Sequence, residues 1–202
     1  HSLIFENPTD NYNNLWNTAQ TVADPNNLAL WMTETGDNFD NTWQTAVKLS
    51  CTIGNSFKYG NCRAWVWWIL ARDADNNAMV LNGVYTPKYY QMAHYGRFVK
   101  PGARRIESSS SDTQLREVAF ENTNGSVVVV VINRTSNARS ASVAGAGLPA
   151  SYHAYQSTSP TSMMQDMGTV ALGAELSLPA WSITTFSSTP MTEARKFRPV
   201  SQ

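Results

Sequence analysis

The sequence predicts an α/β first half joined to an all-β second half. Before about residue 105, helical patterns alternate with short apolar runs of the kind found in parallel strands buried on both faces. After that point, apolar and polar residues alternate between Gly, Ser and Asn turns, which indicates an antiparallel sandwich. The helix and strand order of the first half predicts a parallel sheet.

The elements of the first half follow from apolar spacing. A stripe over 12–23 fits an amphipathic helix, a second stripe covers 39–53, and Pro87 suits the first turn of a third helix. The sequence predicts helices at 12–23, 39–53 and 86–99, buried strands at 28–32 and 63–71, a connection at 54–61 and a polar loop at 73–83. Two strands and a possible stub at 1–5 cannot close such a sheet, so we expect more strands upstream of residue 1.

The second half contains short strands and turns without helices. Turn residues include Asn124-Gly125, 145–149 and Gly168. The predicted strands are 115–122, 126–133, 138–143, 152–156, 175–178 and 182–186. The segment from Pro190 has no periodicity and is expected to be a poorly ordered tail.

Composition narrows the class of protein. The chain has 202 residues, enough for a sizeable core, and carries 15 basic and 15 acidic residues. A nucleic-acid-binding protein usually has a basic excess, and none exists here. The low charged fraction of 15% and the seven tryptophans are typical of a secreted carbohydrate-active protein. The longest apolar run, 127–132, is too short to cross a membrane. The chain opens at His1 without a signal peptide, which indicates a processed chain or a fragment.

Two further patterns concern covalent chemistry. Cys51 and Cys62 are the only cysteines, and their pairing in a charge-poor, Trp-rich chain predicts a disulfide, with two buried thiols as the alternative. Asn124-Gly-Ser and Asn133-Arg-Thr match the N-glycosylation sequon, although such triplets often arise by chance in sequences rich in Asn, Ser and Thr.

Glu34 is the foremost catalytic candidate. It follows an apolar run and precedes Gly36, where the strand is expected to end. In a (β/α)8 barrel the catalytic residues lie at the C-terminal ends of strands. The alternative is a carboxylate that caps or pairs at a strand end.

Aromatic and basic residues follow on the next strand. Strand alternation directs Trp65 and Trp67 to one face and Trp68 to the other, either as core or as a platform for sugar. Arg72 is expected to bind a substrate carboxylate or to pair with Asp73 or Asp75. His94, in the third helix, is expected to be a packing residue. The sequence shows no Cys/His metal cluster, phosphate loop or nucleophilic serine motif, so no cofactor is expected.

Four segments resemble glycoside hydrolase family 30. They are LWMTETG at 30–36, AWVWW at 64–68, the stretch 89–106 that contains FVKPG, and LPAWSITTF at 178–186. The resemblance implies the last strands and helices of a (β/α)8 barrel at 1–103, a β-sandwich at 104–188 and a tail at 189–202. It also implies that the sandwich takes one strand from upstream of residue 1.

The same resemblance implies retaining hydrolysis of a β-linked polysaccharide, most similar to the xylanase branch. Glu34 matches the nucleophile, Trp68 an aromatic that stacks on sugar, and Arg72 a residue that holds a glucuronate side group, while the acid/base falls upstream of His1. The family pattern has a Tyr where this chain has Ala74, and often an aromatic residue where it has Gly36. These two departures leave glucuronate dependence open. Alternatives are a glucosylceramidase or endo-β-1,6-glucanase of the same family, or a non-catalytic carbohydrate-binding module.

Overall fold

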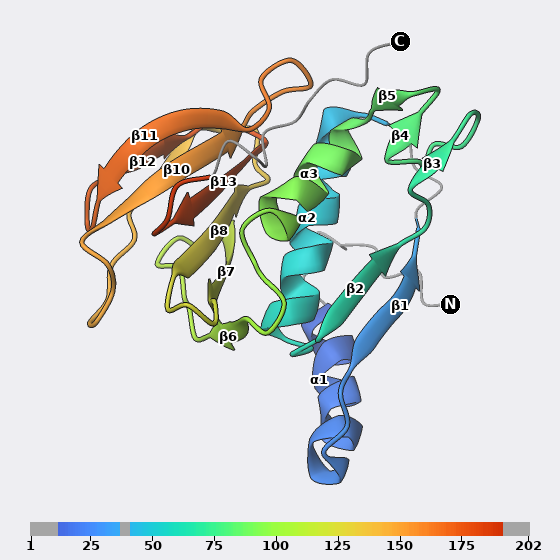
Figure 1. Cartoon of the computed structure of the whole chain (residues 1–202), viewed down its shortest axis with the longest axis horizontal. Helices are drawn as coiled ribbons and strands as arrows, with labels where there is room; N and C mark the ends of the chain where they lie inside the picture. Colours follow the sequence, from blue (N-terminus) through green and yellow to red (C-terminus); the bar gives the residue numbers. More distant parts are fainter. Residues whose placement is uncertain (1–11, 37–40, 192–202) are drawn as a thin grey trace.

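A small parallel sheet, a pair of helices and a larger antiparallel sheet follow one another across the molecule (Figure 1). The computed structural model describes residues 12–36 and 41–191. Side chains from both helices and from the large sheet form one apolar core, against which two tryptophans of the small sheet also pack. The two halves of the chain therefore share a core.

Strands β1 (Trp31–Thr35) and β2 (Ala64–Trp67) form the small parallel sheet. Helix α2 (Trp43–Lys58) makes the crossover that parallel neighbours require. Helix α1 (Tyr12–Ala23), with the bounds predicted from its apolar spacing, leads into the 3-10 turn η1 (Asp24–Asn26). Within the described ranges, parallel pairing is limited to β1–β2 and the short β3–β4 contact, so a barrel is not formed by these residues alone.

Helix α2 is longer than the sequence predicts. It continues through residues 54–58, which read as a connection. Gly54 is buried, and a Cβ there would lie 2.9 Å from the Tyr95 hydroxyl oxygen, so this glycine permits close packing and does not end the helix. Among the described helices none has the length and apolar character needed to cross a membrane, and α2, the longest of them, has 16 residues.

A three-stranded sheet forms around the polar loop predicted at 73–83, and its first and last strands flank that loop. Its strands are β3 (Ala71–Arg72), β4 (Val80–Leu81) and β5 (Val84–Tyr85). Strands of two residues are too short to show an alternating pattern in sequence. Helix α3 (Pro87–Gly96) follows, with Pro87 in its first turn as predicted.

The second half is a sandwich of a six-stranded antiparallel sheet, ordered β11-β10-β13-β8-β7-β6, and a two-stranded sheet, β12-β9. The strands are β6 (Arg104–Ile106), β7 (Leu115–Glu121), β8 (Val127–Asn133), β9 (Arg139–Ala141), β10 (Ser151–Ser157), β11 (Gln165–Ala171), β12 (Leu176–Leu178) and β13 (Ser182–Ser187). The sequence predicted all of these except β6 and β11. Strand β11 is an exposed edge strand interrupted by Gly168, and it therefore lacks an apolar alternation.

Strand β8 joins the two cores of the molecule. Val128, Val130 and Ile132 belong to the core shared with the helices. Val127 and Val131 belong to the second core, which lies between the two sheets of the sandwich. A strand buried on both faces explains the unbroken apolar run that the sequence shows there.

Cys51 and Cys62 do not form the predicted disulfide. Both are buried thiols, Cys51 in the shared core and Cys62 in a separate cluster with Trp16. The backbone N of Cys62 donates to the carbonyl of Ser56 at 3.1 Å, and α2 rises by about 7.5 Å between Cys51 and Ser56. A disulfide needs Cα atoms within about 7 Å and converging side chains. The prediction failed because it ended the helix before residue 54.

Candidate functional site

The end of strand β1 carries Glu34 on an irregular stretch of backbone. The pairing register with β2 shifts between Met32 and Thr35, so that Thr33 and Glu34 together lie opposite Val66. Bulges of this kind redirect side chains and are common next to active sites. The Glu34 side chain is exposed. The sequence placed Glu34 at a strand end but gave no sign of the bulge.

Trp68 follows β2 and lies beside the end of β1. Its backbone N donates to the carbonyl of Thr35 at 2.7 Å, and its own carbonyl oxygen would lie 3.2 Å from a Cβ at Gly36. The Trp68 side chain is 46% exposed, and the Trp68–Ile69 peptide bond is cis. The structure thus brings Glu34 and Trp68 to the same edge of the small sheet, and both remain accessible to solvent.

Trp65 and Trp67 serve the core. Their rings stack with centroids 5.8 Å apart and an interplanar angle of 16°. Both are half-buried against the core shared by the helices and the large sheet. This is the division of faces that strand alternation predicted, and it leaves Trp68 as the accessible tryptophan of the three.

The segment after Trp68 is held by a buried lysine and by Trp67. Lys88, at the start of α3, has no exposed surface; its Nζ donates to the carbonyl of Asn76 at 2.7 Å and lies 5.6 Å from the centre of the Trp67 ring. The indole Nε1 of Trp67 donates to the carbonyl of Asn77 at 2.6 Å. A Cβ at Gly36 would lie 3.4 Å from Oδ1 of Asn77, so this segment rests against the end of β1. Nothing in the sequence marks Lys88 as buried, because a lysine in a first helical turn normally faces water.

Arg72 lies on β3, in the same segment. One guanidinium nitrogen is 4.0 Å from a carboxylate oxygen of Asp75, and 57% of the Arg72 side chain is exposed. The sequence left open a substrate carboxylate or an aspartate partner, and the structure shows the aspartate. An ion pair this long and exposed is weak, so Arg72 can exchange Asp75 for another carboxylate at little cost.

His94 lies away from this edge, between α3 and the large sheet. It is fully buried, with Nδ1 2.9 Å from Oγ1 of Thr185 and Nε2 2.8 Å from Oγ of Ser157. Burial lowers the pKa of His94 to about 3, so the ring is neutral. His94 is a packing residue, as the sequence predicted. Within the described ranges, no cluster of three or more His, Cys, Asp and Glu side chains is arranged to hold a metal ion.

Comparison with known proteins now identifies the second half. Residues 102–186 match the family described as glycosyl hydrolase family 30 beta sandwich domain. This segment belongs to glycosyl hydrolase family 30. It is 29% identical over 165 residues to glucuronoxylanase XynC of Bacillus subtilis (strain 168), a match that covers 78% of this chain and 39% of that relative.

Two further proteins are similar to this chain. The family 30 endoxylanase of Clostridium papyrosolvens C71 superposes with a TM-score of 0.72 at 26% identity, covering 85% of this chain and 45% of that one. Lysosomal acid glucosylceramidase of Mus musculus is 39% identical over 111 residues, covering 47% of this chain and 21% of that relative. The chain thus spans less than half the length of the family 30 proteins it matches.

Proposed function

We propose that this chain is the C-terminal part of a secreted, retaining glycoside hydrolase that acts on a β-linked polysaccharide, with xylan as the first candidate. The observation that carries the proposal is that Glu34 and Trp68 both lie at the carboxyl ends of two paired parallel strands. Residues 1–103 are proposed to complete a (β/α)8 barrel together with upstream strands, and residues 104–188 form its side domain. A polysaccharide is too large to enter a cell, so the enzyme acts outside it.

Glu34 is the proposed nucleophile. In retaining hydrolysis its carboxylate attacks the anomeric carbon, the glycosidic bond breaks, and a covalent glycosyl-enzyme forms that water then hydrolyses. A second carboxyl group, about 5–5.5 Å from the first, protonates the leaving oxygen and later activates the water. That group is proposed to lie upstream of His1.

Trp68 and Arg72 are the proposed substrate contacts. The accessible indole of Trp68 offers an apolar face for the C–H face of a sugar ring, and its backbone is bonded to Thr35, the residue after the proposed nucleophile. Arg72, held only loosely by Asp75, suits a uronate side group. Because Ala74 supplies no hydroxyl to share such a group, xylan without glucuronate is an equal candidate.

The glucosylceramidase alternative is supported by the similarity to the mouse enzyme. The same Glu34 chemistry would serve it, with Trp68 stacking on glucose in place of xylose. An assay of the upstream-extended protein on xylan, glucosylceramide and β-1,6-glucan would separate the three substrate classes.

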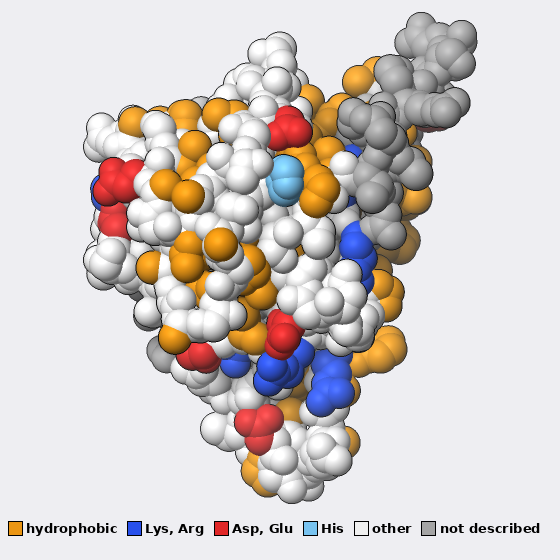
Figure 2. All heavy atoms as spheres, turned by 60° about the vertical axis from the view of Figure 1, so that its left-hand side comes forward, with side chains coloured by type: hydrophobic (Ala, Val, Ile, Leu, Met, Phe, Trp, Pro, Cys, Tyr) orange, Lys and Arg blue, Asp and Glu red, His pale blue; other side chains and the backbone are white. Residues whose placement is uncertain are grey.

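The alternative of a carbohydrate-binding module is less well supported by the surface of the sandwich. Four of the aromatic residues in 104–188 are buried and the fifth is half-buried: Phe120, Tyr152, Tyr155, Phe186 and Trp181. Figure 2 shows apolar side chains on the sandwich face, several of them gathered near its middle. A sandwich that binds sugar by stacking would be expected to expose aromatic rings.

A covalent label tests the proposed nucleophile without the upstream acid. An activated 2-deoxy-2-fluoro-β-xyloside with a dinitrophenolate leaving group needs little protonation, and its glycosyl-enzyme hydrolyses slowly. Incubation with residues 1–202, and with the upstream-extended protein, should add one glycosyl group, which fragment-ion spectra place on Glu34. Glu34→Gln should abolish labelling. A label on another carboxylate, or no label on either protein while both are folded, would refute the assignment.

A further inference from the structure

The two Asn-x-Ser/Thr triplets of the chain have opposite surroundings after folding. In N-glycosylation the side-chain Nδ2 of the asparagine forms the bond to the sugar. The decisive property is therefore whether Nδ2 is accessible. Asn133, at the end of β8, has no exposed surface, whereas Asn124, at the tip of the β7–β8 hairpin, is exposed.

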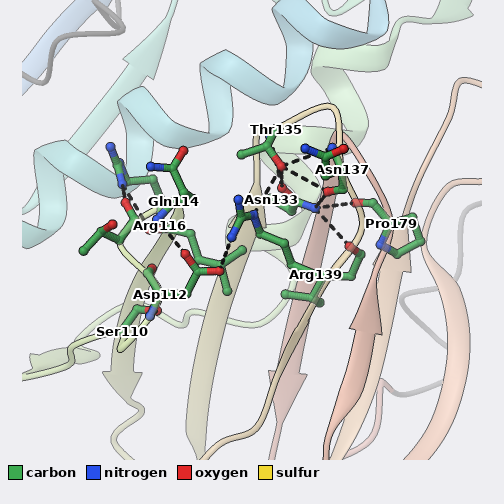
Figure 3. A network of polar contacts seen from close by, with 12 residues as sticks. Ser110, Asp112, Gln114, Arg116, Asn133, Thr135, Asn137, Arg139 and Pro179 are labelled. Atoms are coloured by element: carbon green, nitrogen blue, oxygen red, sulfur yellow. Dashed lines mark hydrogen bonds and ion pairs between the residues drawn. The ribbon is translucent and has the colours of Figure 1, made fainter.

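Both polar atoms of the Asn133 side chain have hydrogen-bond partners inside the sandwich. Its Nδ2 donates to the carbonyl oxygens of Asn137 at 2.8 Å and of Leu178 and Pro179 at 3.0 Å each (Figure 3). Its Oδ1 accepts from the backbone N of Thr135 at 3.0 Å and from the Thr135 hydroxyl at 2.8 Å. Both hydrogens of Nδ2 are committed to these three backbone carbonyls.

Arg139 holds the loop beside Asn133 through two further hydrogen bonds. Arg139 donates from Nε to the Thr135 hydroxyl at 3.3 Å and from its guanidinium to Asp112 at 2.5 Å (Figure 3). A sugar on Asn133 would replace one donating hydrogen and occupy the space between these loops. The folded chain therefore has no room for a glycan at Asn133, although the triplet there is complete.

The Asn124 side chain has a different arrangement. The hairpin closes through the backbone N of Asn122, which donates to the Ser126 carbonyl at 2.8 Å, and through Gly125 N, which donates to the Asn122 carbonyl at 2.9 Å. Oδ1 of Asn124 accepts from Ser126 N at 3.1 Å and from the Ser126 hydroxyl at 2.7 Å. Its hydrogen bonds within the described residues all use Oδ1, so Nδ2 is left to face water.

The turn also has space for a large group. Gly125 has φ +77°, and a Cβ there would meet no heavy atom within 4 Å. The hairpin tip lies by β6, since Arg104 pairs with Glu121 next to the turn. In Figure 1 this end of the large sheet is at the bottom, whereas β1 and β2 point upward toward β3, β4 and β5. A glycan at the tip would not cover the edge that carries Glu34.

We propose that Asn124 is an N-glycan acceptor and that Asn133 is a structural asparagine whose triplet is not used. The donor is a lipid-linked diphosphate oligosaccharide. The Nδ2–C1 bond forms, the glycosyl–phosphate bond breaks, the lipid diphosphate leaves, and one Nδ2 proton is lost to a base. The proposal uses the secretion part of the proposed function and no part of its catalysis, so a failed hydrolysis assay leaves it untouched.

The test is expression of residues 1–202 behind a secretion signal in insect cells, followed by digestion with a peptide N-glycanase in H2(18)O. Release of a glycan converts its asparagine to 18O-labelled aspartate. Trypsin leaves both asparagines in one peptide, 117–134, so fragment ions must place the label. A parallel sample without glycanase measures spontaneous deamidation of Asn124-Gly125. Both the medium and the microsomal fraction are analysed, so that retained chain is scored as well.

The expected result is glycanase-dependent label at Asn124 and none at Asn133 in the secreted chain. Asn124→Gln and Ser126→Ala should remove the label, and Ser126→Thr, which keeps the hydroxyl, should restore it. The proposal is overturned if Asn124 carries no glycan in either fraction, or if secreted chain carries one at Asn133.

Discussion

His94 on α3 and Thr185 on β13 are joined by two hydrogen bonds. The Thr185 hydroxyl donates to the His94 carbonyl at 3.2 Å, and Nδ1 of the His94 ring lies 2.9 Å from the same hydroxyl oxygen. A hydroxyl has one hydrogen, so Nδ1 must carry the ring proton. Nε2 then accepts from the Ser157 hydroxyl at 2.8 Å, and that oxygen accepts from the backbone N of Met164 at 2.8 Å. The neutral ring thus fits this contact fully, and a protonated ring would face a donor at Nε2.

The buried imidazole predicts a loss of stability in acid. The pKa of His94 is lowered to about 3 in the folded chain, against about 6.5 when unfolded. Above pH 6.5 the ring is neutral in both states and has no effect on the pH dependence. As the pH falls from 6.5 toward 3, the unfolded state alone gains the proton, and the free energy of unfolding decreases by about 1.4 kcal/mol per pH unit from this group. Urea unfolding at several pH values measures that slope.

Asp and Glu carboxylates also titrate in the lower part of this pH range. The pH dependence of the free energy of unfolding is therefore compared between the wild type and His94→Gln. Glutamine offers one donor and one acceptor but does not ionise. The variant should lose stability at pH 7 by about 1–3 kcal/mol and show a shallower decline between pH 6.5 and 5. Equal slopes in both proteins over that interval would contradict a buried neutral histidine.

The two cysteines predict a chain that is indifferent to reductant. With no Cys51–Cys62 bridge, dithiothreitol should leave Tm unchanged, and the intact mass should correspond to two thiols. Burial raises the pKa of Cys62 to about 12, so its thiolate is scarce and alkylation at pH 8 should be slow until denaturant is added. A mass lower by two hydrogens, together with a fall in Tm on reduction, would restore the disulfide.

Asn133 predicts a large mutational effect. Asn133→Ala removes a buried side chain that donates to three backbone carbonyls and accepts from Thr135, so the free energy of unfolding should fall by about 3 kcal/mol or more. Asn133→Asp should be at least as costly, because it places carboxylate oxygens against those carbonyls. Asn124→Ala, exposed in the same kind of triplet, should cost less than about 1 kcal/mol. Equal unfolding midpoints for Asn124→Ala and Asn133→Ala would show that the buried network contributes little.

Lys88 predicts a local effect on the segment after Trp68. Lys88→Met keeps much of the volume but leaves the Asn76 carbonyl without the ammonium and removes the charge near the Trp67 ring. Residues 73–79 should become more mobile, and trypsin should cut faster after the neighbouring Arg72. Lys48→Met, on the exposed side of α2, is the matched control. Equal cleavage rates after Arg72 in the wild type and both variants would mean that Lys88 does not hold this segment.

The fold was predictable where side-chain spacing is regular. Helix α1 and six strands of the sandwich follow from apolar periods of about 3.6 and 2. The end of α2 was not predictable, because Gly54 looks the same in sequence whether it ends a helix or packs under Tyr95. That error also produced the incorrect disulfide. The strands β3 to β5 have only two residues each, and the edge strand β11 is exposed on both faces, so neither shows an apolar alternation in the sequence.

The candidate site was likewise predictable from the sequence only in part. Alternation correctly separated Trp68 from Trp65 and Trp67, since the direction of a strand side chain is a local property. The bulge at Thr33 and Glu34 and the burial of Lys88 both arise from contacts between segments. Such contacts are fixed only once the sheet and helices have assembled.

In the proposed mechanism the nucleophile Glu34 lies in this chain and the acid/base lies upstream of His1. We therefore predict that residues 1–202 alone do not turn over xylan efficiently. Glu34 would attack the anomeric carbon, but with the acid/base upstream no positioned acid would protonate the leaving oxygen and no positioned base would activate water. General acid–base assistance is worth about 10²–10⁴-fold, so turnover should fall at least that far below the rate of the upstream-extended protein. On a dinitrophenyl xyloside, which needs little acid, the chain should release at most one equivalent of phenolate, and Glu34→Gln should release none. Rapid xylan hydrolysis by residues 1–202 would contradict this division and require a second catalytic carboxylate within them.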